Sequence, residues 1–385
     1  MSKYYFSDIA INSTEKKKPV EEDKYTYLGL ENLDPERFKV SRIGSDVAPT
    51  GDKLIMRKGD VLFGRRGAFQ RKVAIAPIDG IFSAHGMVLR PKEDVVDKDF
   101  FPMFISSDEF ISTAMRISVG SLSLTVNWKD LKQQEFYLPE MDEQKKIAKL
   151  LWALERTKEA YRDLFGKTDE LIKAQFIEQF WEKDYPVVRV EEICDFVTKG
   201  TTPPTKEITK EPVGDSVPYL KVYNLSFDGT MLFEEDPQYI SREIHNTKLA
   251  RSKVFPGDVL MNIVGPPLGK FAIVPDSYSE WNINQAIAIF RAKERIRPRF
   301  LLYALMQPAV LQPFLNKAVG VRQLNISLEQ CRNIEIPLPS LDLQDDFVIF
   351  AEQCERSKKE LQKSIEAVTI AQRAILHDCL SKQEV

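Results

Sequence analysis

The chain has 385 residues, of which 43% are apolar and 29% charged, and its formal net charge is −3. This composition is typical of folded protein rather than disorder, and no apolar run is long enough to cross a membrane. The N-terminus, MSKYYFSDIA, lacks the apolar core of a signal peptide, and the four cysteines form no Cys-x-x-Cys pair. We therefore expect a cytoplasmic protein with reduced thiols, and with only three histidines we expect no metal site.

Residues 1–140 have the pattern of a strand-rich domain. Short apolar runs such as DVLFG, KVAIA and GMVLR are separated by Gly, Pro and Asp, which predicts strands joined by turns. The stretch FPMFISSDEFISTAM predicts short helices beside them. Segment 53–72 holds seven Lys or Arg residues and one acid, so the acidic average of the whole chain conceals a basic patch. This weakens the argument that an acidic chain does not bind nucleic acid.

Residues 141–186 follow Pro139 and carry apolar residues at an approximate heptad spacing, which predicts one long helix. Residues 187–340 again have the pattern of a strand-rich domain, with DVLMNIV, FAIV and AIAIF as expected strands and a second basic segment at 291–299. Residues 341–385 follow Pro339 and predict a second long helix. The residues expected to pack between the helices or against a partner are Ile147, Leu150, Leu154, Tyr161, Leu164, Leu171, Phe347, Phe350, Cys354, Leu361, Val368 and Ile375.

The chain contains the same unit twice. GDVLFGRRGAFQRKVAIAP at 59–77 is matched by GDVLMNIVGPPLGKFAIVP at 257–275, and 117–144 aligns with 317–344 without a gap. YLGLENL at 27–33 likewise corresponds to YLKVYNL at 219–225. We expect an α+β fold in which two strand-rich domains, in pseudo-two-fold arrangement, are separated by two long antiparallel helices. A coiled coil between two chains is the alternative for the helices.

No catalytic signature is present. The chain lacks G-x-x-x-x-G-K-[ST], G-x-G-x-x-G, G-x-S-x-G and H-E-x-x-H. GPPLG at 265–269 resembles the Pro-Pro of amino-methyltransferases, but it lacks the flanking residues that would hold a flipped adenine. We interpret it as a turn between strands, and we expect no catalytic residue and no cofactor in this chain.

Polar and cationic residues instead gather in loops at matching places of the two copies. Arg and Lys can bind phosphates or guanine, and Asn and Gln can bind adenine, whereas Ser and Thr bind either phosphates or bases. For any single residue the alternative is an ordinary surface side chain or a turn hydrogen bond. The candidate DNA contacts are Arg57, Lys58, Arg65, Arg66, Arg71, Lys72, Ser83, His85, Ser121 and Ser123 in the first copy, and Lys199, Thr201, Thr202, Lys221, Asn224, Lys270, Asn282, Asn284, Gln285, Arg322, Gln323 and Asn325 in the second.

These features resemble the specificity subunit of type I restriction–modification systems. The resemblance covers nearly the whole chain and is carried by the doubled Gly-Asp-Val-Leu phrase, the stretch near Gly200, and the boundaries YLPEMDEQKKIAKLL and PLPSLDLQDDFVIF. It implies that 1–140 and 187–340 are target recognition domains, each reading half of a split DNA sequence. The helices 141–186 and 341–385 would then set the spacing between the half-sites.

The resemblance also implies the partners: double-stranded DNA, two modification subunits that bind S-adenosylmethionine and methylate adenine, and restriction subunits that use ATP and Mg²⁺. The first copy has no equivalent of Thr198–Gly214, so we expect its loops to differ from those of the second. A non-catalytic scaffold with a coiled coil, or a decayed specificity subunit, would share many of these features. A methyltransferase or nuclease is disfavoured by the missing motifs.

Overall fold

Strands β6 (Val61–Phe63) and β16 (Val259–Asn262) start at the two copies of the Gly-Asp-Val-Leu phrase in a computed structural model that describes residues 1–120, 123–316 and 324–381. Gly59 and Gly257 precede them with φ of 94° and 89°, a conformation that favours glycine. The next residues, Asp60 and Asp258, are buried and accept two hydrogen bonds each from Arg90 and Arg291, at 2.7–2.9 Å. The repeated Gly-Asp pair therefore serves a turn and a buried ion pair.

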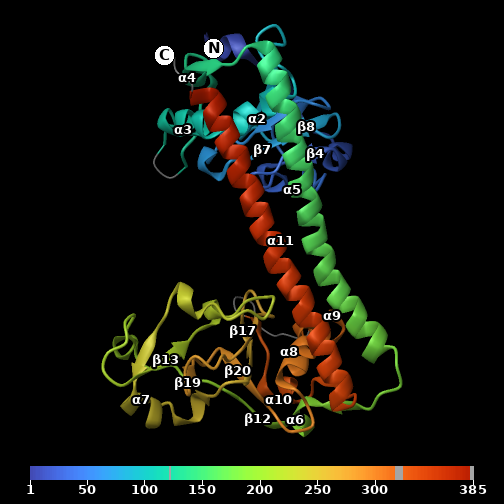
Figure 1. Cartoon of the computed structure of the whole chain (residues 1–385), viewed down its shortest axis with the longest axis vertical. Helices are drawn as coiled ribbons and strands as arrows, with labels where there is room; N and C mark the ends of the chain where they lie inside the picture. The colour runs from blue at the N-terminus through green and yellow to red at the C-terminus, as the bar shows by residue number, and fades with distance from the viewer. Residues whose placement is uncertain (121–122, 317–323, 382–385) are drawn as a thin grey trace. The chain divides into compact units, whose positions relative to one another are not determined.

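The chain forms two compact units, here called unit 1 (Met1–Leu164 with Glu360–Val385) and unit 2 (Phe165–Lys359). Figure 1 labels many of their elements. The strands of unit 1 are β1 (Ser2–Tyr5), β2 (Ala10–Ser13), β3 (Lys16–Lys17), β4 (Tyr27–Leu28), β5 (Lys53–Met56), β6, β7 (Val73–Ile75), β8 (Gly80–Phe82), β9 (Met87–Pro91) and β10 (Glu135–Leu138). Its helices are α1 (Phe6–Ile9), α2 (Phe100–Ser106), α3 (Asp108–Arg116), α4 (Trp128–Leu131) and parts of α5 (Met141–Phe176) and α11 (Leu341–Ser381).

Unit 2 contains the remaining parts of α5 and α11. Its strands are β11 (Val187–Arg189), β12 (Cys194–Lys199), β13 (Ser216–Leu220), β14 (Tyr239–Ser241), β15 (Lys253–Val254), β16, β17 (Val264–Gly265), β18 (Phe271–Ile273), β19 (Trp281–Ile283), β20 (Ile287–Ala292), β21 (Leu324–Asn325) and β22 (Glu335–Pro337). Its shorter helices are α6 (Val190–Ile193), α7 (Arg242–Asn246), α8 (Pro298–Met306), α9 (Pro308–Leu315) and α10 (Leu328–Arg332).

The sheets of the two units have equivalent topologies. The antiparallel sheet β2-β9-β6-β7 of unit 1 corresponds to β12-β20-β16-β18 of unit 2, and the pair β1-β10 corresponds to β11-β22. In the second sheet of each unit, three strands are equivalent: β4, β8 and β5 match β13, β19 and β15, and each set has one parallel and one antiparallel pairing. The fourth strand differs, since β3 pairs with β5 whereas β14 pairs with β13.

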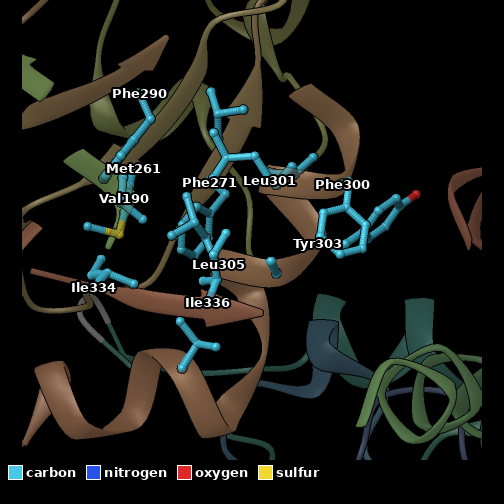
Figure 2. Close-up of a cluster of buried hydrophobic side chains, with 14 of the residues drawn as sticks. Val190, Met261, Phe271, Phe290, Phe300, Leu301, Tyr303, Leu305, Ile334 and Ile336 are labelled. Carbon is cyan, nitrogen blue, oxygen red and sulfur yellow. The ribbon is translucent and has the colours of Figure 1, made fainter. Parts of the chain in front are cut away.

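Each unit buries both faces of its first sheet. In β6, Val61 and Phe63 face the cluster that includes α2 and α3, while Leu62 faces the second sheet. In β16, Met261 likewise faces the α8 side and Leu260 the second sheet. Figure 2 shows Met261, Phe271 and Phe290 near Leu301 and Leu305 of α8. Burial on both faces explains why these strands are apolar without alternation.

The long helices also carry an internal polar layer. In unit 1, buried Lys158 of α5 donates to Gln372 of α11 at 2.7 Å and pairs with Glu155 at 2.6 Å. In unit 2, Lys358 of α11 pairs with Asp169 of α5. Within unit 2 the helix segments run antiparallel, because Phe176 contacts Phe347 while the earlier residue Asp169 contacts the later residue Lys358.

Three of the leucines predicted for the packing stripe of the first long helix do not pack within the chain itself. Leu150, Leu164 and Leu171 are 49%, 51% and 48% exposed, whereas the buried stripe of α5 includes Gln144, Ala148, Leu151, Glu155, Lys158, Thr168, Ile172 and Phe176. The prediction followed the leucines, but half of the buried positions in this stripe are polar or charged. For the second helix, Phe347 and Cys354 are buried as predicted. The other predicted packing residues, Ile147, Leu154, Tyr161, Phe350, Leu361, Val368 and Ile375, are partly buried.

Candidate nucleic-acid interface

In the second sheet of each unit, two neighbouring strands run parallel and therefore finish at the same end of the sheet. In unit 1, β4 and β8 pair in parallel with Leu28 opposite Phe82; in unit 2, β13 and β19 do so with Leu220 opposite Ile283. Because the carboxyl ends of the two strands lie together at this end of the sheet, the segments that follow them are brought close to each other. We call this the loop edge of each unit.

Three loops meet at the loop edge of unit 1. The cationic loop that follows β6 forms a bridge with the loop before α4, between Arg66 and Thr125. The amide of Val126 donates to the carbonyl of Arg65 at 2.9 Å, and the amide of Arg66 donates to the carbonyl of His85 at 3.3 Å. His85 belongs to the loop that follows β8, and its side chain is exposed.

A similar arrangement occurs in unit 2, with one hydrogen bond shifted by a residue. Val264 pairs with Asn325, 198 and 200 positions after Arg66 and Thr125. The amide of Ile326 donates to the carbonyl of Ile263 at 2.9 Å, and the amide of Ile263 donates to the carbonyl of Ala286 at 2.8 Å. The structure therefore brings together, in each unit, the three loops that sequence comparison selected separately.

Unit 2 adds a fourth loop to its edge. The hydroxyl of Thr202 accepts a hydrogen bond of 3.3 Å from the amide of Gln285, and the carbonyl of Thr201 accepts one of 3.2 Å from the hydroxyl of Tyr219. Burial raises the pKa of Tyr219 to about 12, so this hydroxyl stays protonated well above neutral pH. Lys199 and Thr202 are exposed beside these contacts.

Several predicted contacts are not presented to solvent at the loop edges. Asn282 is buried, and its amide is shared between His245, at 3.0 Å, and the carbonyl of Leu249, at 3.1 Å. Asn224 is buried and accepts a hydrogen bond of 2.8 Å from the amide of Lys221. Ser83 is 6% exposed and accepts one of 3.3 Å from the amide of His85. These three side chains stabilise the loops from within.

Two cations of the first copy that were predicted to contact DNA instead bind groups within unit 1. Arg71 pairs with Asp108 and lies 3.7 Å from the carboxylate of Glu36, while the ammonium of Lys72 donates to the carbonyl of Leu30 at 2.7 Å. Unlike Arg66, which is exposed, both are only partly exposed. They fix the shape of the cationic loop.

Arg57 and Lys58 lie at the opposite edge of the sheet. They follow β5, which is antiparallel to β8 and pairs Met56 with Gly80, at the start of β8. The amide of Lys58 donates to the carboxylate of Asp79, which precedes β8, at 2.7 Å. The structure therefore does not bring this pair together with His85, which follows the other end of β8.

The remaining candidates lie at the loop edges or outside the described residues. Ser123, Arg65, Lys221, Lys270 and Asn284 are partly exposed, and Gln285 and Asn325 are exposed. Ser121, Arg322 and Gln323 lie outside the described residues. The basic segment 291–299 is largely engaged in ion pairs, since Arg291, Arg297 and Arg299 face Asp258, Asp345 and Glu352.

Sequence reasoning missed the role of two buried glutamines. Gln144 accepts a hydrogen bond from the amide of Asp97 and donates to the carbonyls of Val95 and Pro139, at 2.9–3.1 Å. Gln344 makes the same three bonds to residues 297, 295 and 339, at 2.8–3.2 Å. The identical offset of 200 for all partners was the available signal. These bonds attach each long helix to the strand-rich part beside it.

Comparison with known proteins agrees with this arrangement. Residues 7–163 and 182–368 match the family model described as the type I restriction modification DNA specificity domain. The chain is 24% identical over 346 residues to the type I restriction enzyme MjaVIII specificity subunit of Methanocaldococcus jannaschii, covering 84% of this chain and 77% of the relative. It is 30% identical over 129 residues to the EcoBI specificity subunit of Escherichia coli, which covers 33% of this chain and 26% of the relative.

Solved structures with this fold include a chain from a type I restriction–modification system, with a TM-score of 0.61 and 19% identity over 98% of this chain and 97% of the other. They also include the S subunit of a type I system from M. genitalium, with a TM-score of 0.52 and 15% identity over 100% of this chain and 96% of the other. Among the residues that the structure describes, no cluster of potential metal ligands occurs. Nor does any helix within the described ranges have the length and apolarity needed to span a bilayer.

Proposed function

The chain belongs to the type I restriction–modification DNA specificity family, and we propose from this premise that its two loop edges each read one half of a bipartite DNA target. As a specificity subunit it recognises DNA and is not itself an enzyme. In this proposal residues 1–140 and 187–340 act as the target recognition domains. Residues 141–186 and 341–385 act as the spacer helices between them.

The observation that supports this proposal best is the convergence of the same three loops in both units. The bridges Arg66–Thr125 and Val264–Asn325 occupy equivalent positions, yet the side chains around them differ. A protein that binds two unlike half-sites needs one framework and two sets of contacting residues. The sheets supply the framework, and the exposed loop residues supply the difference.

We assign the exposed and partly exposed loop residues to two kinds of contact. Cations bind phosphates without sequence preference, whereas amides, hydroxyls and imidazole can bind base edges. The proposed phosphate contacts are Arg65, Arg66, Lys199, Lys221 and Lys270, and the proposed base contacts are His85, Ser123, Thr201, Thr202, Asn284, Gln285 and Asn325. Ser83, Asn224 and Asn282 are left out because they are buried, and Arg71 and Lys72 because they are paired.

Type I specificity subunits bind DNA and assemble with other subunits of their systems. We propose two modification subunits, which carry S-adenosylmethionine, and restriction subunits, which use ATP and Mg²⁺, in the cytoplasm. Exposed apolar side chains on the long helices, among them Leu150, Leu171 and Ile349, would supply contacts for these partners. In the described residues they are not buried by the chain itself.

Fluorescence anisotropy tests the proposal with the full chain, its modification subunits and labelled duplexes. The expected result is tight binding to duplexes that carry the sequence at which the assembled subunits methylate adenine. Binding to random duplexes should be weaker and salt-sensitive. Equal affinity for both would contradict sequence recognition. No binding to any duplex, with the subunits assembled, would favour a scaffold.

A further inference from the structure

The cationic loop of unit 1 ends in a short, rigid tip that no assigned role uses. Helical turn η3 (Ala68–Gln70) lies between Gly67 and Arg71, whose φ angles of 71° and 51° both fall in the left-handed region. Ala68 is buried beneath the turn. Phe69 is 58% exposed and Gln70 is also exposed, so the turn presents an aromatic ring and an amide together.

Contacts on both sides hold this tip in place. On one side, the amide of Gly67 donates to the carbonyl of Leu124 at 2.9 Å, and the guanidinium of Arg66 donates to the hydroxyl of Ser123 at 2.5 Å. On the other side, Arg71 pairs with Asp108. A large apolar side chain held outward on a fixed turn gains contact area on binding with little further loss of conformational freedom.

The tip borders an open hollow of about 430 Å³. Its lining combines apolar side chains with polar groups, and comprises Leu30, Arg66, Gly67, Phe69, Gln70, Ser123 and Leu124. This lining is complementary to the major-groove side of an A·T pair. Thymine offers a methyl group for apolar contact, and adenine offers a donor and an acceptor that match a glutamine amide. We propose that Phe69 contacts a thymine methyl and Gln70 binds the paired adenine, an inference that rests on the proposed DNA-binding role of this edge.

The corresponding loop of unit 2 lacks both side chains. Between β17 and β18 it carries Pro266, Pro267 and Leu268, and the two prolines are exposed. Neither an aromatic ring nor an amide occupies this part of the loop. Substitutions at Phe69 and Gln70 should therefore change one half-site only.

Sequencing of methylated adenines tests this in cells that supply the modification subunits together with the wild-type, Phe69→Ala, Gln70→Ala or Gln70→Glu chain. The Ala variants should relax discrimination at one A·T pair of one half-site by roughly 5- to 150-fold. Gln70→Glu should shift the preference there toward cytosine, whose N4 amino group a carboxylate accepts. The other half-site should stay unchanged.

Tyr25→Ala serves as the matched control, since Tyr25 is 69% exposed and precedes β4, at the opposite end of that strand from Leu30. It should leave the methylated sequence unchanged, and equal melting temperatures would establish that all variants fold. Unchanged half-sites in the Phe69 and Gln70 variants would overturn the inference, as would equal weakening at all sequences or loss of subunit assembly. A wild-type chain that directs no methylated sequence would instead contradict the proposed function itself.

Discussion

The guanidinium of Arg66 donates a hydrogen bond of 2.5 Å to the hydroxyl of Ser123, which lies 57 residues later in the chain. This bond joins the cationic loop to the loop before α4 and orients the one arginine of the cationic loop that is exposed in unit 1. Arg71, in the same loop, instead pairs with Asp108. Two arginines five residues apart therefore have different expected roles.

Arg66→Ala should lower DNA affinity at all sequences and reduce the salt dependence of binding. Each lost phosphate contact reduces the slope of log K against log salt by about 0.9. Arg71→Ala should leave that slope unchanged and lower the melting temperature, because Asp108 loses its partner. Anisotropy titrations at several salt concentrations separate the two, and equal slopes for wild type and Arg66→Ala would exclude phosphate contact by Arg66.

Gln144→Ala should reduce the free energy of unfolding by about 1–3 kcal/mol, because it leaves the partly buried amide of Asp97 and two carbonyls without their partner. Gln344→Ala should have a similar effect, since its contacts are equivalent. Denaturant unfolding measures both. Gln133→Ala is the control, because Gln133 is exposed, and a loss as large in this variant would refute the explanation.

Lys158→Leu should destabilise the chain by about 3–5 kcal/mol, because it leaves the buried Glu155 carboxylate with only the more distant Arg162, at 4.0 Å, as a cation. The double variant with Glu155→Leu should recover part of that loss, since two apolar residues often replace a buried ion pair at little cost, but buried Gln372 loses its bonds to both side chains. A double-mutant cycle in denaturant determines the coupling. Strictly additive losses would mean that the pair is not coupled.

His245 should make stability depend on pH. Burial, then the cations Lys253 and Arg242, lower its pKa below 6.5, against the opposing effect of Glu280 at 3.6 Å. Above pH 6.5 the imidazole is neutral in both states; below it, only the unfolded chain takes up the proton, so stability falls as pH falls toward the folded pKa. His245→Gln should flatten the melting temperature between pH 7 and about 5 relative to wild type. An unchanged pH profile would contradict this role.

Leu150→Asp should weaken association with the modification subunits while leaving the melting temperature within a few degrees of wild type, because Leu150 is 49% exposed. Co-purification of the tagged chain with its subunits measures the effect. Lys149→Asp, an exposed neighbour, controls for added charge. If both variants assemble like wild type, this face of α5 is not a docking surface.

The repeat allowed much of the fold to be predicted, because equal residues at equal spacing require equal turns, strands and ion pairs. In both units the turn before the strand contains a glycine with positive φ, at Gly59 and Gly257. The next residue, Asp60 or Asp258, pairs with the guanidinium of a partly buried arginine in the same way. The repeat could not reveal that β3 and β14 occupy opposite edges of their sheets. Those strands depend on loops that the two copies do not share.

The contacting residues were harder to predict than the loops. Asn282 and Gln285 lie three positions apart in one polar stretch, yet one is buried against His245 and the other is exposed. Whether an amide caps a loop or faces solvent depends on what packs behind it, which residue type does not reveal. The buried stripe of α5 could not be located from its leucines for the same reason, since Gln144, Glu155 and Lys158 are buried with polar partners inside the fold.

The central claim is that each unit reads one half of a bipartite sequence. Sequencing genomic adenine methylation tests it in cells that express the modification subunits with and without this chain. We predict a single methylated sequence of two short blocks, separated by a fixed number of unread bases and present only with the chain. A methylation pattern that is independent of the chain, or one continuous block without a gap, would contradict it.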